Sequence, residues 1–292
     1  DLFVVTNQQY MLVYTQQGKF FWMRVYEIPE GSRTSKGRAI QNLINIEQDD
    51  KVKAFICTKD LKDDEYINNH YVIMATKRGQ VKKTSLEQYS RPRVNGINAI
   101  TIKEDDELLE AKLTDGNSQV MLALKSGKAI RFEEAKTRPM GRNASGVRGI
   151  RLQHDKDEVI GMVAVNDMES NILVVSSNGY GKRSRLEDYR ITNRGGKGVK
   201  TISITEKTGD LVAIKNVDDS NGLMIINKSG IAIRMAVEDL RVMGRATQGV
   251  KLINIKDGDS IAAVAKVIHE KDEEQHNEEL ESTEENNTNS EQ

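Results

Sequence analysis

A segment of roughly 50 residues is repeated five times along this chain of 292 residues. Each copy holds an apolar run, a polar turn that ends in glycine, and a second run with basic residues. The turn glycines are Gly18, Gly79, Gly127, Gly179 and Gly230. A second glycine follows each of them after 17 to 19 residues, at Gly37, Gly96, Gly146, Gly198 and Gly249. Such a repeat limits the chain to folds that stack one supersecondary unit several times.

The residue pattern inside each copy indicates strands rather than helices. Apolar residues alternate after the second glycine, as in Ile100/Ile102 and Ile202/Ile204. Period-two alternation, β-branched residues and glycine turns are typical of strands, and a unit of this length holds about four of them. We therefore predict an all-β, propeller-like fold whose blades repeat around an axis. An irregular β-sandwich is the alternative.

The chain is predicted to begin inside a repeat. Residues 1–6 (DLFVVT) align with residues 210–215 (DLVAIK), which form the last strand of a unit. We therefore expect a fragment that lacks the upstream part of its first blade, with a folded domain over residues 1–268.

Charge is divided unevenly between the repeats and the end of the chain. The formal net charge is −1, but residues 269–292 hold ten acidic residues and one lysine, which leaves +8 on residues 1–268. The acidic segment has too few apolar residues to offset the entropy of ordering, so we predict a disordered tail. It either competes with a polyanion for the basic body or serves as a solubilising segment.

Basic residues recur in phase with the repeat. Four residues after the turn glycine stand Lys83, Arg131, Arg183 and Arg234, with Trp22 in the first copy. Four residues before the second glycine stand Arg33, Arg142, Arg194 and Arg245, with Pro92 between Arg91 and Arg93 in the second copy. Further candidates are Lys36, Arg38, Lys82, Arg148, Lys182, Lys197, Lys200 and Lys251. Residues at one phase of a ring lie on one rim, so we predict a basic stripe that contacts a bent DNA duplex. A solvated face is the alternative.

The strongest local motif is Thr192–Gly198 (TNRGGKG). Gly195, Gly196 and Gly198 would let backbone N–H groups approach a phosphate, and Arg194 and Lys197 would add charge-assisted hydrogen bonds. The spacing differs from a nucleotide-binding P-loop. A tight β-turn without a ligand explains the glycines equally well.

Other chemistry finds little support in the sequence. The four histidines are isolated and the single cysteine is Cys57, so we predict neither a metal site nor an intrachain disulfide. We recognise no catalytic motif and assign no catalytic residue. Aromatic residues make up 5% of the chain, which argues against single-strand stacking. No apolar run is long enough to span a membrane, and a soluble cytoplasmic protein is expected.

Four stretches resemble the family of DNA gyrase A C-terminal domains. They are residues 27–40, 178–184, 193–200 and 244–253. The resemblance implies a six-bladed β-pinwheel whose blades exchange strands, present here as about five blades and the last strand of the first. It also implies DNA wrapping by the rim. The family's signature box, of the Gln-Arg-Arg-Gly-Gly-Lys-Gly type, belongs to the first blade. Thr192–Gly198 resembles that box on a later unit.

The same resemblance implies partners and a place in a larger enzyme. These are duplex DNA, an upstream breakage–reunion domain that holds the catalytic tyrosine, and DNA gyrase B in a heterotetramer of two A and two B subunits. The holoenzyme would introduce negative supercoils with ATP and Mg²⁺ bound on other domains, near the nucleoid. The alternatives are the equivalent C-terminal domain of topoisomerase IV, which selects DNA geometry, and a propeller scaffold that binds proteins.

Overall fold

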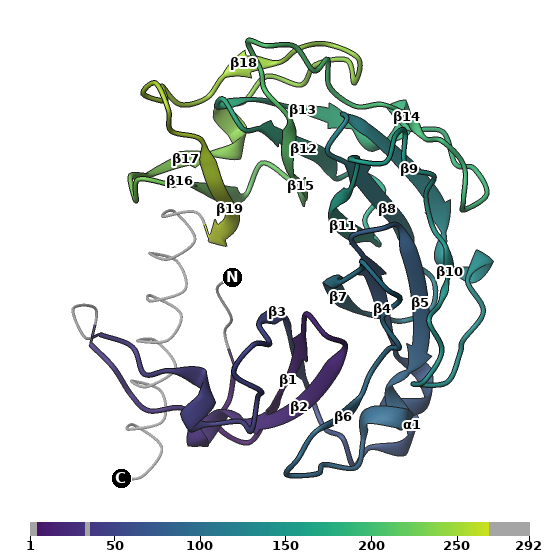
Figure 1. Ribbon diagram of the computed structural model, residues 1–292. Helices are drawn as coiled ribbons and strands as arrows, with labels where there is room; N and C mark the ends of the chain where they lie inside the picture. Colours follow the sequence, from purple (N-terminus) through teal and green to yellow (C-terminus); the bar gives the residue numbers. More distant parts are fainter. Residues whose placement is uncertain (1–4, 33–35, 269–292) are drawn as a thin grey trace, which may run out of the picture.

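The computed structural model describes residues 5–32 and 36–268. These residues form five antiparallel sheets, which are arranged as blades around a common axis (Figure 1). One strand of each sheet faces the axis and the other strands follow outwards. The predicted all-β propeller is confirmed, with five blades.

The blades are numbered in chain order, and their strands are given from the axis outwards. Blade 1 has β3 (Val52–Thr58), β1 (Tyr10–Thr15), β2 (Lys19–Arg24) and β6 (Ile97–Asn98). Blade 2 has β7 (Leu108–Thr114), β4 (Tyr71–Thr76), β5 (Gln80–Ser85) and β10 (Val147–Arg148). Blade 3 has β11 (Val159–Val165), β8 (Gln119–Leu124), β9 (Lys128–Glu133) and β14 (Val199–Lys200). Blade 4 has β15 (Leu211–Val217), β12 (Asn171–Ser176), β13 (Tyr180–Arg185) and β18 (Val250–Lys251). Blade 5 has β19 (Ile261–Ile268), β16 (Asn221–Asn227) and β17 (Ala232–Ala236).

Short helical elements connect the strands. A 3₁₀ turn follows the second hairpin strand of each repeat: η1 (Val25–Glu27), η3 (Leu86–Tyr89), η4 (Glu134–Lys136), η5 (Leu186–Asp188) and η6 (Val237–Asp239). Another turn, η2 (Ile40–Asn42), lies before β3. The charged insertion of the first repeat contains α1 (Asp64–Asn69), which begins where the Asp63 side chain accepts a hydrogen bond from the Tyr66 amide at 3.1 Å. None of the helices in the described ranges is long and apolar enough to cross a membrane.

The turn glycines close the hairpins at the centre of each blade. Gly79 joins β4 to β5 and has φ of +90°, a conformation that residues with a side chain rarely adopt. A Cβ there would also lie 2.8 Å from the backbone oxygen of Ile150. The glycine is therefore required both by the turn and by the close passage of the next repeat.

The fourth strand of blades 1 to 4 comes from the following repeat. β10 belongs to the third repeat, yet it pairs with β5 of blade 2, placing Val147 opposite Val81. β6, β14 and β18 join blades 1, 3 and 4 in the same way. The predicted four strands per unit and the strand exchange implied by the resemblance are both confirmed for these blades.

Blade 5 has three strands among the described residues, and its edge strand β17 is more exposed than its equivalents. Ile231, beside this strand, is 48% exposed, whereas the middle of β13 is buried. A Cβ added to Gly37 of the first repeat would have no atom within 4 Å, unlike one at Gly96, Gly146, Gly198 or Gly249. The predicted strand over residues 1–6 lies mostly outside the described residues, as do Arg33 and the acidic segment 269–292.

The apolar core lies between the blades. One cluster joins Ile73 and Val81 of blade 2 to Val120, Leu122 and Phe132 of blade 3. Each of these side chains is buried, and burying a side chain of this size stabilises the fold by about 2 kcal/mol. Both faces of the sheets in blades 2 to 4 are therefore largely covered by the neighbouring blades.

Candidate nucleic-acid interface

The basic residues four positions after the turn glycine do not lie on the rim surface. Lys83, Arg131 and Arg183 are 5%, 8% and 8% exposed. Each side chain extends from the third strand of its blade to the 3₁₀ turn of the next repeat. Our prediction that these three residues contact DNA is corrected by this burial, because a buried cation cannot reach a phosphate.

Arg131 illustrates the connection between neighbouring blades. Its Nη1 donates to the backbone oxygens of Leu186 and Tyr189, at 2.9 Å each, and its Nε donates to Gln119 at 2.6 Å. Burial lowers the pKa of the guanidinium. Arg183 likewise donates to the Leu240 oxygen at 2.6 Å. At the equivalent position in blade 2, Lys83 Nζ lies 3.5 Å from the buried Glu134 carboxylate.

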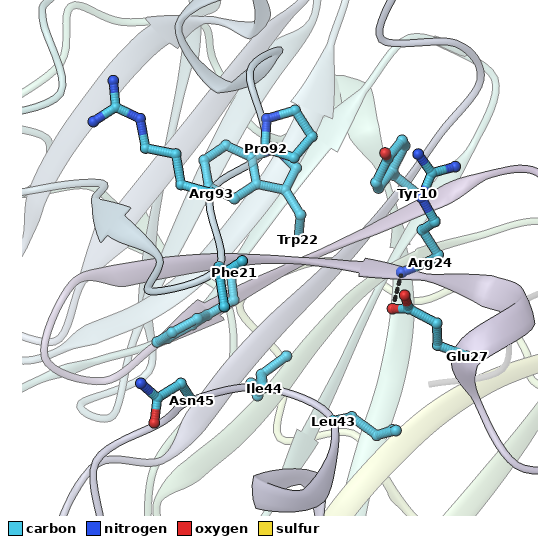
Figure 2. Close-up of a pocket in the computed structure, with 11 residues that line it drawn as sticks. Tyr10, Phe21, Trp22, Arg24, Glu27, Leu43, Ile44, Asn45, Pro92 and Arg93 are labelled. Carbon is cyan, nitrogen blue, oxygen red and sulfur yellow. Dashed lines mark hydrogen bonds between the residues drawn. The ribbon is translucent and has the colours of Figure 1, made fainter.

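Trp22 occupies the same position in the first repeat and makes the equivalent bond. Its indole N–H donates to the backbone oxygen of Tyr89 at 2.6 Å. Figure 2 shows the indole beside Pro92, in a pocket of about 320 Å³, while the Arg93 guanidinium extends away. Tryptophan can therefore replace a basic residue at this position, because the position supplies an N–H donor to the next blade.

Lys82 and Lys182 are also buried, at 0% and 1% exposed, and the prediction that they contact DNA is corrected in the same way. Lys82 Nζ donates to the backbone oxygen of Arg142 at 2.7 Å. Lys182 Nζ donates to the backbone oxygens of Gly244 (2.7 Å), Thr247 (3.0 Å) and Arg245. Burial, and then the neighbouring arginine, lower the pKa of Lys82 to about 7 and that of Lys182 to about 8. These lysines hold the loops that precede β10 and β18.

Arg142, Arg194 and Arg245 connect successive outer strands. They are half-buried, and each donates through Nη1 to the second residue of the preceding outer strand. The accepting oxygens belong to Asn98 (3.3 Å), Arg148 (3.2 Å) and Lys200 (2.7 Å) respectively. Part of each guanidinium is thus engaged within the protein, and its charge remains at the rim.

Arg148 and Lys200, which provide two of those oxygens, are themselves cationic and exposed. Arg148, Lys200 and Lys251 are the second residues of β10, β14 and β18, and all three are exposed at the outer edge of the ring (Figure 1). They were predicted as DNA contacts, and the structure places them at one position of three successive blades. Their spacing follows the blade repeat, as contacts along one duplex backbone require.

A second set of exposed arginines, one in each of three successive repeats, was not predicted from the sequence. Arg138, Arg190 and Arg241 are exposed, and each stands eight residues before the second glycine of its repeat. The residue after each one forms a parallel bridge to the third strand of the neighbouring blade, which anchors the start of the loop. The signal was available in the sequence as a further in-phase arginine.

The remaining predicted contacts lie near the first and last blades. Arg91 and Arg93 are exposed in the loop that precedes β6, and Lys36 and Arg38 are exposed in the first repeat. Arg234 is exposed on β17. The structure therefore brings Arg91, Arg93, Arg148, Lys200 and Lys251 to the outer loops together with Arg138, Arg190 and Arg241.

The Thr192–Gly198 loop differs in backbone from its equivalents. Gly195 has φ of +83°, whereas the equivalent residues Asn143 and Ala246 do not adopt positive φ, and its N–H donates to the Gly149 oxygen at 2.6 Å. Gly198 has φ of +71°, and a Cβ there would lie 2.6 Å from the Ala129 oxygen. The turn at residues 194–195 has counterparts at residues 142–143 and 245–246, so positive φ at Gly195 is what distinguishes this loop. The glycines have structural reasons of their own.

Beside this turn lies a hollow of about 150 Å³, lined by residues that include Arg190, Asn193 and Lys197. Lys197 is exposed, whereas Arg194 donates to the backbone oxygens of Lys136 (3.1 Å) and Arg148. In this blade Ile130 stands where blades 2 and 4 have the buried Lys82 and Lys182, and it lines the hollow. Phosphate binding by the loop stays a prediction.

The two cations of this loop are expected to act differently. Lys197→Gln should weaken DNA binding about fivefold at 0.15 M salt and reduce the salt slope by about 1, the effect of one phosphate contact. Arg194→Gln should also reduce DNA bending, because the loop loses two bonds to its neighbours. Affinity and bending would be measured by fluorescence titration and energy transfer across a labelled duplex. Lys156→Gln, an exposed lysine on another turn, is the control. Equal values for all three variants would contradict the assignment.

Within the described part of the chain, no three His, Cys, Asp or Glu side chains gather as metal ligands. The features that recur from blade to blade are instead an exchanged outer strand and exposed arginine and lysine side chains. Fold and surface together define a β-propeller with exchanged strands and a cationic rim.

Comparison with known proteins identifies the family. A model of the "DNA gyrase C-terminal domain, beta-propeller" matches five segments, residues 9–59, 70–115, 120–166, 170–218 and 223–268, one for each blade. The chain therefore belongs to the DNA gyrase C-terminal domain family. It is 42% identical to the DNA gyrase A protein of Staphylococcus epidermidis over 273 residues, which are 93% of this chain and 30% of that protein. It thus spans about 30% of the length of such relatives.

Solved structures that share the fold include two C-terminal domains of related proteins. The C-terminal domain of DNA topoisomerase IV superposes with a TM-score of 0.80 at 24% identity, over 90% of this chain and 80% of the other. A DNA gyrase A C-terminal domain gives 0.76 at 23%, over 90% and 84%. At these identities the superpositions establish the blade arrangement and nothing about the ligand.

Proposed function

We propose that this chain binds duplex DNA along its outer rim and bends it, as the C-terminal domain of a DNA gyrase A protein. One observation carries the proposal: in four successive repeats, the segment from the 3₁₀ turn to the exchanged outer strand presents at least two exposed basic residues. Eight of them form pairs, Arg91 and Arg93, Arg138 and Arg148, Arg190 and Lys200, and Arg241 and Lys251, and Lys197 is exposed beside the third pair. If each contacts one phosphate, about eight contacts predict that log K falls with log salt at a slope of about −7.

The arrangement favours contact with the backbone rather than with base edges. Lysine and arginine at the rim neutralise phosphates along one side of a duplex, and the arc of the blades holds those cations on a curve (Figure 1). The cost of bending depends on DNA deformability, so sequence preference would come from shape. Within the complete protein, the bent segment would be passed to an upstream breakage–reunion domain.

The same proposal includes the partners, cofactors and cellular location of the complete enzyme. The partner would be DNA gyrase B in a heterotetramer of two A and two B subunits, with ATP and Mg²⁺ used on other domains and no cofactor on this one. The complete enzyme would introduce negative supercoils near the nucleoid in the cytoplasm. The acidic residues 269–292 would form a separate tail. The family membership and the basic rim support this assignment.

Ligation of nicked plasmid in the presence of the chain tests DNA wrapping. We expect the topoisomer distribution to shift relative to protein-free plasmid, because DNA wrapped around the rim retains its writhe when the nick is sealed. The variant with glutamine at Arg148, Lys200 and Lys251 should shift it less. An unchanged distribution together with tight binding would instead indicate selection of DNA geometry, as in the topoisomerase IV alternative. Absence of binding would favour a protein scaffold.

A further inference from the structure

Three lysines share one position of the inner strands, at the opposite end of the sheets from the rim. In blades 2, 4 and 5 the strand register places Lys112 opposite Ile73, Lys215 opposite Leu173, and Lys266 opposite Leu223. Ile56 and Val163 occupy the same position in blades 1 and 3. The five inner strands surround the axis (Figure 1), so the three lysines stand at one level along it.

These lysines line a common cavity. It has a volume of about 390 Å³ and is bounded by residues of all five inner strands. Lys112 and Lys215 are half-buried, whereas Lys266 is exposed and donates to the Asn216 oxygen at 3.2 Å. The walls combine these polar groups with apolar side chains such as Phe55 and Met162. The apolar part of the wall reduces the dielectric screening between the charges.

Positive charge in this cavity exceeds negative charge. Among the lining residues, the single carboxylate is Glu110, whose Oε1 lies 3.5 Å from Lys112 Nζ. Burial, and then the Lys112 ammonium, lower the pKa of Lys215. The lysines therefore repel one another, and an anion placed between them would remove that repulsion.

We propose that the axial cavity binds a small multivalent oxyanion of the polyphosphate class, held by Lys112, Lys215 and Lys266. An ammonium on a flexible stem acts as a point charge toward phosphate oxygens, and three of them match a ligand with several phosphates better than orthophosphate. The ligand would join blades 2, 4 and 5 across the axis. It would stabilise the fold in proportion to its occupancy. This site is independent of the proposed function at the rim.

Calorimetric titration of the complete chain with tripolyphosphate tests the proposal. The chain would carry glutamine at Arg148, Lys200 and Lys251, so that the rim competes less for the probe. We expect one binding event per chain, and a weaker one with orthophosphate. Lys112→Met, Lys215→Met and Lys266→Met together should reduce affinity roughly tenfold or more, because three attractive charges are lost. Lys62→Met, Lys156→Met and Lys228→Met, three exposed lysines on other turns, form the matched control.

A label inside the cavity tests where tripolyphosphate binds, separately from the calorimetric affinity. Cys57 is the single cysteine of the sequence and lines the same cavity. A trifluoromethyl label on its thiol should show a saturable ¹⁹F shift with tripolyphosphate in the parent chain and none in the axial triple variant. The single variants Lys112→Gln and Lys266→Gln replace the triple if it fails to fold. Equal affinity of axial and control variants, or a label that does not respond at saturation, would overturn the proposal.

Discussion

We expect Lys182→Met to lower the free energy of unfolding by roughly 2–3 kcal/mol, which corresponds to a fall in melting temperature of about 5–10 °C. The Lys182 ammonium donates to backbone oxygens of Gly244, Arg245 and Thr247 and to the Thr247 hydroxyl at 3.0 Å. Methionine fills similar volume and leaves those oxygens without their donor. Thermal and urea unfolding followed by circular dichroism would measure the loss.

The matched control for this prediction is Arg185→Met on the same strand. Arg185 is 68% exposed and pairs with the exposed Glu187 at 3.3 Å, and such surface pairs contribute about 0–1 kcal/mol. Its removal should leave the melting temperature nearly unchanged. If both variants lose the same stability, the Lys182 contacts do not hold the loop before β18.

The second large effect concerns DNA. We expect glutamine at Arg148, Lys200 and Lys251 together to weaken duplex binding about 100-fold at 0.15 M salt, because each lost phosphate contact removes about 1 kcal/mol of counterion-release free energy. The salt slope should fall by about 3. The side chains are exposed, so the fold should be unaffected. Titration of a labelled duplex at several salt concentrations measures both quantities.

Three exposed lysines away from the outer loops provide the comparison. Lys62→Gln, Lys156→Gln and Lys228→Gln remove the same net charge. They should reduce affinity only through the weaker long-range field, with little change in slope. A similar loss in both triple variants would show that net charge, and not the position of the rim residues, governs binding.

Much of the fold could be predicted because the repeat depends on residues that are close together in the sequence. Turn glycines such as Gly79 must adopt positive φ, and the alternating apolar residues must pair as strands. The sequence also showed that Trp22 replaces the basic residue of the other repeats. Only the structure explains this replacement, because the indole donates to the Tyr89 backbone oxygen, 67 residues away in sequence.

The functional assignment of individual residues was less accurate. Lys82, Lys83, Arg131, Lys182 and Arg183 were predicted at the rim but are buried. Strand alternation separates core from solvent only when one face of a sheet is exposed. In blades 2 to 4 both faces of the inner sheet pack against neighbouring blades, so a basic residue on either face is buried and must find oxygen acceptors there.

The sequence alone determined the five repeats, the hairpin turns and the family resemblance, since each depends on residues close together in the chain. Only the tertiary structure decided which cations reach solvent. Arg148, Lys200 and Lys251 are exposed because each stands on a two-residue strand at the outermost edge of a blade. Lys112, Lys215 and Lys266 line one cavity because three distant strands reach the axis in the same register. Both sets depend on the order of strands in the sheets, which no local pattern encodes.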